Sequence, residues 1–185
     1  MSQTYCLKTP LTTEALAPLK VGDKVLISGV IYTARDAAHK RLVELVKAGQ
    51  DLPFDIRGAV IYYVGPSPAR PGKPIGSAGP TTSYRMDKYS PILLDAGLKG
   101  MIGKGERSQA VIDAMVRNKA VYFASVGGTA VVSAQAVKAS RLVAYEDLGA
   151  EAIMELTVEN FPCFVANDIY GNDIYQIGVS QFRRE

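Results

Sequence analysis

The sequence is poor in the residues that bind metals or form disulfides. Its 185 residues include only two cysteines, Cys6 and Cys163, and a single histidine, His39. Two cysteines cannot form a disulfide framework, and neither lies in a metal-binding spacing. A bound iron–sulfur cluster needs about three or four thiolates, so we expect this chain to bind no metal and no cluster by itself. Sparse cysteines of this kind are typical of a reduced, intracellular protein.

Long apolar runs and dense clusters of one charge are also missing. No run approaches the roughly 18 apolar residues of a membrane span, and the N-terminal MSQTYCLKTP has no apolar signal region. We therefore expect a cytoplasmic protein that does not enter the membrane. The net charge is +3 without a run of lysine and arginine, so nucleic-acid binding is not indicated. A mild positive charge suits a site for small anions.

The pattern of apolar residues predicts a single α/β domain over residues 1–185. Apolar residues make up 48% of the sequence and charged residues 21%, as in ordinary soluble domains. β-branched apolar runs alternate with segments of helical period, which favours a layered α/β fold. The expected strands are 25–31, 58–65, 100–102, 120–124, 142–145 and 162–166, and the expected helices are 36–48, 85–96, 108–119 and 129–139.

Less regular structure is expected at both ends and in the middle of the chain. Residues 1–20 are predicted to form an extended lead-in, in which Thr12 or Thr13 caps a short turn. Turns and one last short strand are expected after Asn167. Residues 65–80 contain so many prolines and glycines that a helix or a central strand is excluded. We interpret them as an ordered loop rather than a disordered linker.

Three basic side chains follow predicted strands or glycine-rich turns: Arg35, Arg85 and Lys104. Ligands of open α/β sheets gather outside the carboxyl ends of the strands, so these cations could converge on one anionic ligand. Arginine holds a carboxylate through two hydrogen bonds, whereas lysine acts as a point charge. The alternative is that all three are ordinary surface cations. His39, predicted one helical turn after Arg35, is more often structural when considered alone.

The segment 77–83, Ser-Ala-Gly-Pro-Thr-Thr-Ser, is the most unusual part of the sequence. Successive small residues expose backbone N–H groups that can bind an anion. A threonine hydroxyl there could act as a base only if a neighbouring cation stabilised its alkoxide. The simpler alternative is that these hydroxyls cap the following helix. No dinucleotide or phosphate-loop motif, carboxylate pair or Ser-His-Asp set is present.

Several segments together resemble the β subunit, or C-terminal domain, of class I fumarases. The similarity extends over roughly residues 5–178 and is most specific in the Gly-Pro-Thr-Thr-Ser block with its following arginine and Met-Asp pair. The segments that carry the resemblance are 28–42, 62–66, 76–87, 103–108 and 144–149.

The resemblance implies a swivelling β/β/α-type layered domain, as in aconitase-like enzymes, and a division of labour between two subunits. It places a 4Fe-4S cluster in a partner, the fumarase α subunit, together with the aspartate that acts as the acid. A chain of this length without cluster ligands then implies a separate α partner. The resemblance assigns catalytic roles to Thr81, the proposed base, and Lys104, substrate binding to Arg35, Thr82 and Arg85, and a supporting role to His39.

The resemblance implies a fumarate hydratase, a hydro-lyase that interconverts fumarate and (S)-malate and is active only with its α subunit. The β subunit of L(+)-tartrate dehydratase shares the Gly-Pro-Thr-Thr-Ser block and is the nearest alternative. Residues 31–39 look like the fumarase version because the tartrate version tends to carry cysteines there. Mesaconate hydration and a non-catalytic paralogue are further alternatives. The retained Arg35, Thr81, Arg85 and Lys104 argue against a purely structural chain.

Overall fold

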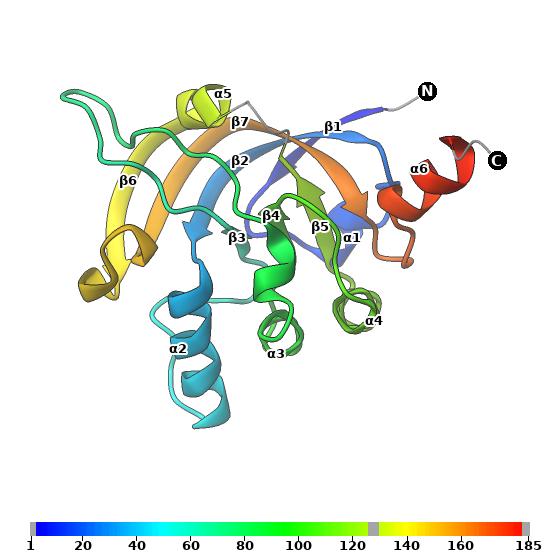
Figure 1. Cartoon of the computed structure of the whole chain (residues 1–185), viewed down its shortest axis with the longest axis horizontal. Coiled ribbons are helices and arrows are strands. Elements are labelled where there is room, and N and C mark those ends of the chain that lie inside the picture. The colour runs from blue at the N-terminus through cyan, green and yellow to red at the C-terminus, as the bar shows by residue number, and fades with distance from the viewer. Residues whose placement is uncertain (1–2, 126–129, 183–185) are drawn as a thin grey trace.

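The computed structural model describes residues 3–125 and 130–182. Within these residues, seven strands form one mixed sheet, in the order β1-β2-β3-β4-β5-β7-β6 (Figure 1). The strands are β1 (Thr4–Lys8), β2 (Lys24–Thr33), β3 (Val60–Tyr62), β4 (Gly100–Gly103), β5 (Val121–Ala124), β6 (Val137–Ala144) and β7 (Ile153–Asn167).

The sheet curls back on itself because β7 pairs with two separate strands of the parallel set, β2 and β5. Strands β2, β3, β4 and β5 are parallel neighbours. Strand β7 runs antiparallel to both β2 and β5, so these pairings close a ring. Strand β6 extends β7 as an antiparallel neighbour. The curled sheet has an inner face and an outer face, and each one buries its own apolar cluster.

The helical segments are short and are distributed around this sheet. In Figure 1, α2, α3 and α4 lie together on one side of the sheet, whereas α5 lies on the opposite side. None of the helices in residues 3–125 and 130–182 is long and apolar enough to span a membrane. The segments are α1 (Thr13–Leu16), α2 (Asp36–Lys47), η1 (Ser83–Met86), α3 (Ser90–Asp95), α4 (Gln109–Asn118), α5 (Ala130–Ala136), η2 (Glu146–Glu151) and α6 (Ile174–Phe182).

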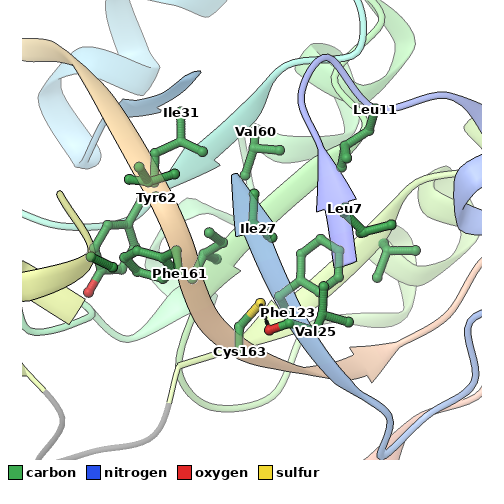
Figure 2. Close-up of a cluster of buried hydrophobic side chains, with 14 of the residues drawn as sticks. Leu7, Leu11, Val25, Ile27, Ile31, Val60, Tyr62, Phe123, Phe161 and Cys163 are labelled. Carbon is green, nitrogen blue, oxygen red and sulfur yellow. Dashed lines mark hydrogen bonds between the residues drawn. The ribbon is translucent and has the colours of Figure 1, made fainter. Parts of the chain in front are cut away.

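Two hydrophobic clusters account for the layers. The inner cluster gathers side chains from β1, β2, β3, β5 and β7, including the fully buried Ile27, Tyr62 and Phe161 (Figure 2). The outer cluster joins the other face of the sheet to helices α2, α3 and α4. Helix α2 contributes Leu42 and Val43, which recur on its buried face as the helical period requires. The expected α/β domain is therefore confirmed.

The proline-rich segment 65–80 forms an ordered arm, as predicted. Its two limbs are joined by hydrogen bonds from Ser67 N to Ser77 O (3.0 Å) and from Gly76 N to Ser67 O (3.1 Å). The Ser140 hydroxyl on β6 donates to the Pro74 carbonyl, and Ile75 is buried. In Figure 1 this arm extends alongside α5 and β6. Because proline has no backbone N–H, a few specific hydrogen bonds hold this arm in place of a regular ladder.

The helix predicted over 85–96 is wrong as a continuous element. The chain forms η1 up to Met86 and starts again as α3 at Ser90. Pro91 lies in the first turn of α3, where its missing N–H is tolerated, but a continuous helix would need that N–H as a donor.

Three predictions in the second half of the chain were also incomplete or wrong. The helix predicted over 129–139 ends at Ala136, and β6 follows because its alternating residues pair with β7. Thr129 lies outside the described residues. The strand predicted at 162–166 is only the end of the much longer β7. A helix, α6, replaces the predicted last strand: Asp173 accepts the backbone N–H of Tyr175 and so caps it.

The N-terminal lead-in is more regular than predicted. Residues 4–8 form β1, which pairs in parallel with the first half of β2. Thr12, rather than Thr13, is the N-cap of α1, and its hydroxyl accepts the N–H of Ala15 at 3.3 Å.

Candidate functional site

The candidate site lies where β2, β3 and β4 end. These strands are parallel neighbours, so their carboxyl ends meet at the same edge of the sheet. Arg35 follows β2 and is the N-cap residue of α2, and Lys104 follows β4 directly. We call the set Arg35, Thr81, Thr82, Arg85 and Lys104 the site edge.

The two threonines lie between the ends of β3 and β4. The N–H of Thr81 donates to the carbonyl oxygen of Tyr63, just after β3, at 2.6 Å. Thr82 forms an isolated parallel bridge with Lys104, and Ser83 N donates to Lys104 O at 2.8 Å. The threonines therefore continue the sheet beyond its strands, and Thr82 is beside Lys104. Both are half-buried, whereas the lysine side chain is exposed.

The capping alternative for these hydroxyls is contradicted for Thr82. Thr82 occupies the N-cap position of η1, yet its side chain makes no capping hydrogen bond. Its backbone is extended, with φ −63° and ψ 123°, as expected from its bridge to Lys104. Its hydroxyl therefore has no structural role at the start of η1.

The two arginines approach each other through residues of α2. Arg85 binds the Asp36 carboxylate through Nε and Nη2, each at 3.0 Å. Asp36 is the next residue after Arg35, so this pair brings Arg85 beside Arg35. Arg35 in turn contacts Glu151, with 3.3 Å between Nη2 and Oε1. Arg35, Arg85 and Lys104 thus come from separate segments that meet at this end of the sheet.

His39 lies beneath the site and does not enter it. Its side chain is fully buried on α2, and Nδ1 donates to the Arg35 carbonyl oxygen at 2.8 Å. Burial lowers the pKa of His39 to about 4, so the ring is neutral near pH 7. Nε2 has no hydrogen-bond partner among the described residues. The ring packs edge-on against Tyr63, with centroids 5.2 Å apart, which is consistent with a supporting role.

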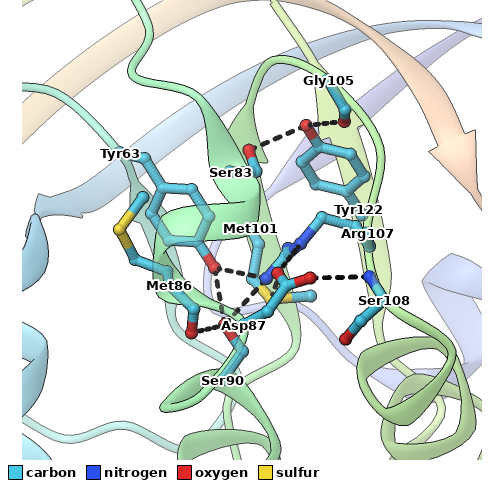
Figure 3. Close-up of polar contacts among 10 residues, drawn as sticks. All are labelled: Tyr63, Ser83, Met86, Asp87, Ser90, Met101, Gly105, Arg107, Ser108 and Tyr122. Carbon is cyan, nitrogen blue, oxygen red and sulfur yellow. Dashed lines mark hydrogen bonds and ion pairs between the residues drawn. The ribbon is translucent and has the colours of Figure 1, made fainter.

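A buried polar cluster beneath the site edge was missed by the sequence reasoning. Figure 3 shows its centre, Arg107, whose side chain is fully buried. Arg107 binds Asp87 at 2.8 Å and the Ser90 hydroxyl at 2.8 Å, and its guanidinium lies over the rings of Tyr63 and Tyr122. A single arginine after Gly-Lys-Gly-Glu gives no sequence signal of burial, because most arginines are exposed.

The buried cluster joins the two loops that carry the site. Asp87, which follows η1, binds Arg107 and also accepts the N–H of Ser108. The Ser83 hydroxyl contacts the Tyr122 hydroxyl at 2.8 Å, and Tyr122 donates to the Gly105 carbonyl at 2.9 Å. The threonine segment and the lysine loop are therefore fixed to each other from below.

Two glycines at the site edge leave no room for a side chain. A Cβ atom at Gly103 would lie 2.0 Å from the Ser83 hydroxyl oxygen and 2.9 Å from Tyr63 Cδ2. A Cβ at Gly65 would lie 2.9 Å from Arg35 Nη1. All three distances are too short for a Cβ contact. Glycine is thus required for close packing here, not for an unusual backbone conformation.

The described residues do not provide a set of cluster ligands. In residues 3–125 and 130–182, no three His, Cys, Asp or Glu side chains gather as a metal site would need. Cys6 is exposed and Cys163 is buried. Burial raises the pKa of the Cys163 thiol, which disfavours the thiolate that a metal would require. These residues therefore do not fit an iron–sulfur cluster.

The fold and the site define an α/β domain in which three basic residues and two threonines lie where the parallel strands end. Comparison with known proteins identifies the family: the model for the fumarase C-terminus matches residues 2–178. The chain belongs to this family.

Named relatives include fumarases longer than this chain and a protein named as a subunit. "Fumarate hydratase class I, anaerobic" of Escherichia coli is 44% identical over 163 residues, which cover 87% of this chain and 30% of the relative. "Fumarate hydratase 2" of Leishmania major is 36% identical, covering 91% of this chain and 30% of the relative. A Methanocaldococcus jannaschii protein, provisionally named an L(+)-tartrate dehydratase subunit beta, is 38% identical, covering 90% of this chain and 88% of the relative. The chain thus spans about 30% of the fumarases it matches.

Proposed function

We propose that this chain is the β-type part of a class I fumarate hydratase, which interconverts fumarate and (S)-malate. The observation that carries the proposal is the gathering of Arg35, Arg85 and Lys104 beside two threonines at one sheet edge. Membership of the fumarase C-terminus family supports the same reaction class, a hydro-lyase.

The charges of the site edge match a four-carbon dicarboxylate. Such a substrate carries two carboxylates, and each one needs a cationic partner when it leaves water. Arg35 and Arg85 can each offer two N–H donors to a carboxylate. Lys104 is a point charge beside Thr82. In the proposal the arginines bind and orient the substrate, Thr82 adds a hydroxyl contact, and Lys104 contributes to both binding and turnover.

Thr81 is proposed as the base in malate dehydration. Its side-chain oxygen, deprotonated to an alkoxide, would take the C3 proton and become a hydroxyl. The C3–H electrons would form the C2–C3 double bond as the substrate hydroxyl leaves C2, and Thr81 would release the proton to solvent before the next turnover. A neutral hydroxyl is too weak a base at pH 7, so the step requires the positive charge of Lys104 or Arg85 and a site closed to water. In the hydration direction the same hydroxyl would return the proton to C3.

The missing parts of the reaction are assigned to a partner. A 4Fe-4S cluster, bound by an α subunit, would supply an iron site for the substrate. The acid that protonates the leaving hydroxyl would also come from that subunit. We infer that residues 1–185 act as one swivelling domain of the aconitase-like type, whose site edge is completed only when the α subunit covers it. The separate M. jannaschii subunit supports such a division.

L(+)-tartrate dehydration is the second candidate function. The relative provisionally named a tartrate dehydratase subunit beta is matched over 88% of its own length, more than any of the fumarases described above. Against it, residues 31–39 contain no cysteine. Mesaconate is a third candidate substrate, because it is also an unsaturated dicarboxylate.

A reconstituted complex tests the function. The chain and its cluster-bearing α candidate would be co-expressed, reconstituted anaerobically and assayed with malate, tartrate and mesaconate side by side. We expect the highest kcat/KM with malate and no turnover by this chain alone. A preference for tartrate or mesaconate would replace the proposed substrate. A cluster-loaded complex that turns over none of them would make the chain a non-catalytic paralogue.

A further inference from the structure

Each of the two site arginines is held by a carboxylate of this same chain. Asp36 binds Arg85 through the Nε–Nη2 edge of the guanidinium, with both contacts at 3.0 Å. The Nε contact is a hydrogen bond, whereas the Nη2 contact is an ion pair without hydrogen-bond geometry, so Asp36 holds one edge of the guanidinium. This arrangement leaves the Nη1 end, on the other side of the group, directed away from Asp36.

Glu151 holds Arg35 from a distant part of the chain. One carboxylate oxygen lies 3.3 Å from Arg35 Nη2, and the other accepts the N–H of Ala37 at 3.1 Å. Arg35, the N-cap residue of α2, makes no side-chain cap of its own. Glu151, at the end of η2, therefore caps the helix and orients the arginine beside it.

The Arg35 side chain also lies close to Gly65 and to the Ala150 carbonyl. A Cβ at Gly65 would lie 2.9 Å from Arg35 Nη1 and 3.1 Å from the Ala150 carbonyl oxygen. Gly65, the Arg35 guanidinium and the Ala150 carbonyl at the end of η2 therefore lie close together. Arg35 Nε is buried and has no hydrogen-bond partner among the described residues. Glu151 contacts only the Nη2 end, and the Arg35 side chain remains 24% exposed.

We propose that Asp36 and Glu151 are positioning residues, which hold Arg85 and Arg35 ready for the two carboxylates of the substrate. Arginine side chains have many rotamers, and fixing them before binding lowers the entropy lost when the substrate arrives. Each carboxylate occupies only part of one guanidinium, so donors remain for the substrate. The inference rests on the proposed function, since it assumes that both arginines bind the substrate.

Other roles for Asp36 and Glu151 predict a different change in KM. If Asp36 and Glu151 compete with the substrate for the arginines, removing their charge frees the arginines and lowers KM. If they only stabilise the fold, KM does not change. If they position the arginines, removing the charge raises KM, whereas kcat changes little because neither carboxylate contacts the reacting atoms.

The test uses Asp36→Asn and Glu151→Gln in the assembled complex with the α subunit, assayed with malate. Both substitutions keep the shape and remove the charge. We expect KM to rise roughly tenfold in each, the usual size of coupling between contacting residues, and kcat to stay within about threefold. Asp147→Asn is the matched control: Asp147 lies on η2 too, but binds Arg41, and its variant should keep the normal KM.

A double-mutant cycle separates positioning from a general structural effect. In an Arg85→Ala background, Asp36→Asn should raise KM no further, and Glu151→Gln should likewise add nothing to Arg35→Ala. An unchanged or lower KM in the single variants, or additive effects in the double variants, would overturn the proposal. If Asp36→Asn does not assemble, Asp36→Glu carries the same test, because it displaces the carboxylate and must also raise KM. If Arg35→Ala and Arg85→Ala themselves leave KM unchanged, it is the proposed function that fails.

Discussion

Arg107 and Lys104 come from the same loop after β4, yet their surroundings differ completely. The Arg107 side chain is fully buried and has Asp87, Ser90 and two tyrosine rings as partners. Lys104 is exposed at the site edge, and its backbone rather than its charge is used to bridge Thr82. The comparison shows two placements of a cation in one loop: Arg107 fixes the loop from below, whereas Lys104 is exposed, as the proposed contact with a substrate requires.

The largest effect is expected from breaking the buried pair. Arg107→Met would leave the Asp87 carboxylate, which is only 13% exposed, without its cation. Removing one partner of a buried pair typically costs about 3–5 kcal/mol of folding free energy. Urea unfolding of the purified chain would measure this loss.

An exposed ion pair with nearly the same separation provides the control. Arg117 and Asp95 lie 2.7 Å apart, but their side chains are 56% and 51% exposed. Arg117→Met should therefore cost under about 1 kcal/mol. Equal losses in the two variants would refute the view that burial distinguishes Arg107.

The next effect concerns the cations of the site edge. In the assembled complex, Arg35→Ala and Arg85→Ala should each raise KM for malate at least about 30-fold, because a desolvated carboxylate loses its charged partner. Lys104→Ala should raise KM and lower kcat together. Arg41→Ala is the control: Arg41 is on the same helix as Asp36 but binds Asp147. Steady-state kinetics decide the roles, and an unchanged KM in both arginine variants would reject them.

A smaller effect is expected from pH, through His39. Its pKa is lowered by burial from 6.5 to about 4, so the unfolded chain binds the proton more tightly than the folded one. The contribution of His39 to the free energy of unfolding is fully present above pH 6.5. It is lost as the pH drops toward 4, by about 3 kcal/mol in total. His39→Leu should remove this slope in urea unfolding between pH 7 and 5. A wild-type curve that stays flat over this range would show that His39 is not buried neutral.

The smallest effect is expected far from the site edge. Thr12→Ala removes the hydroxyl that caps α1 and should cost about 1 kcal/mol. The KM of the assembled complex should stay unchanged, because α1 contributes nothing to the site edge. Thermal unfolding and malate kinetics on the same preparation provide both values, and a raised KM would mean that the site depends on more of the fold than proposed.

The sequence indicated where the basic residues would lie better than it indicated which residues hold them. Arg35 and Lys104 follow apolar strands, and the carboxyl ends of parallel strands share an edge, so their convergence could be expected. The contact between Glu151 and Arg35 could not be expected, because Glu151 lies far along the chain, between β6 and β7, and comes near Arg35 only in the folded structure. The burial of Arg107 could not be expected either, since it depends on hydrogen bonds to Asp87 and Ser90 from an earlier segment of the chain.

Some errors in the predicted secondary structure could have been avoided from the sequence, and one could not. Pro91 lies in the first turn of α3, and Asp173 directly precedes α6. Both residue types are typical of helix starts, so these two boundaries could have been predicted from the sequence. The length of β7 was not predictable from its own residues. Its exposed positions weaken the apolar pattern, and its pairing with three other strands determines its extent.

The central claim is that Thr81 supplies the base at an edge whose cations come from this chain. The most direct measurement is kcat for malate dehydration in the assembled complex with Thr81→Val, Thr81→Ser and Thr82→Val. Valine keeps the shape of threonine without its hydroxyl, and serine keeps the hydroxyl. The account predicts that Thr81→Val lowers kcat at least about 100-fold, the size of general-base loss, while Thr81→Ser retains most activity. A normal kcat in Thr81→Val would contradict it, and a loss confined to Thr82→Val would move the base to Thr82.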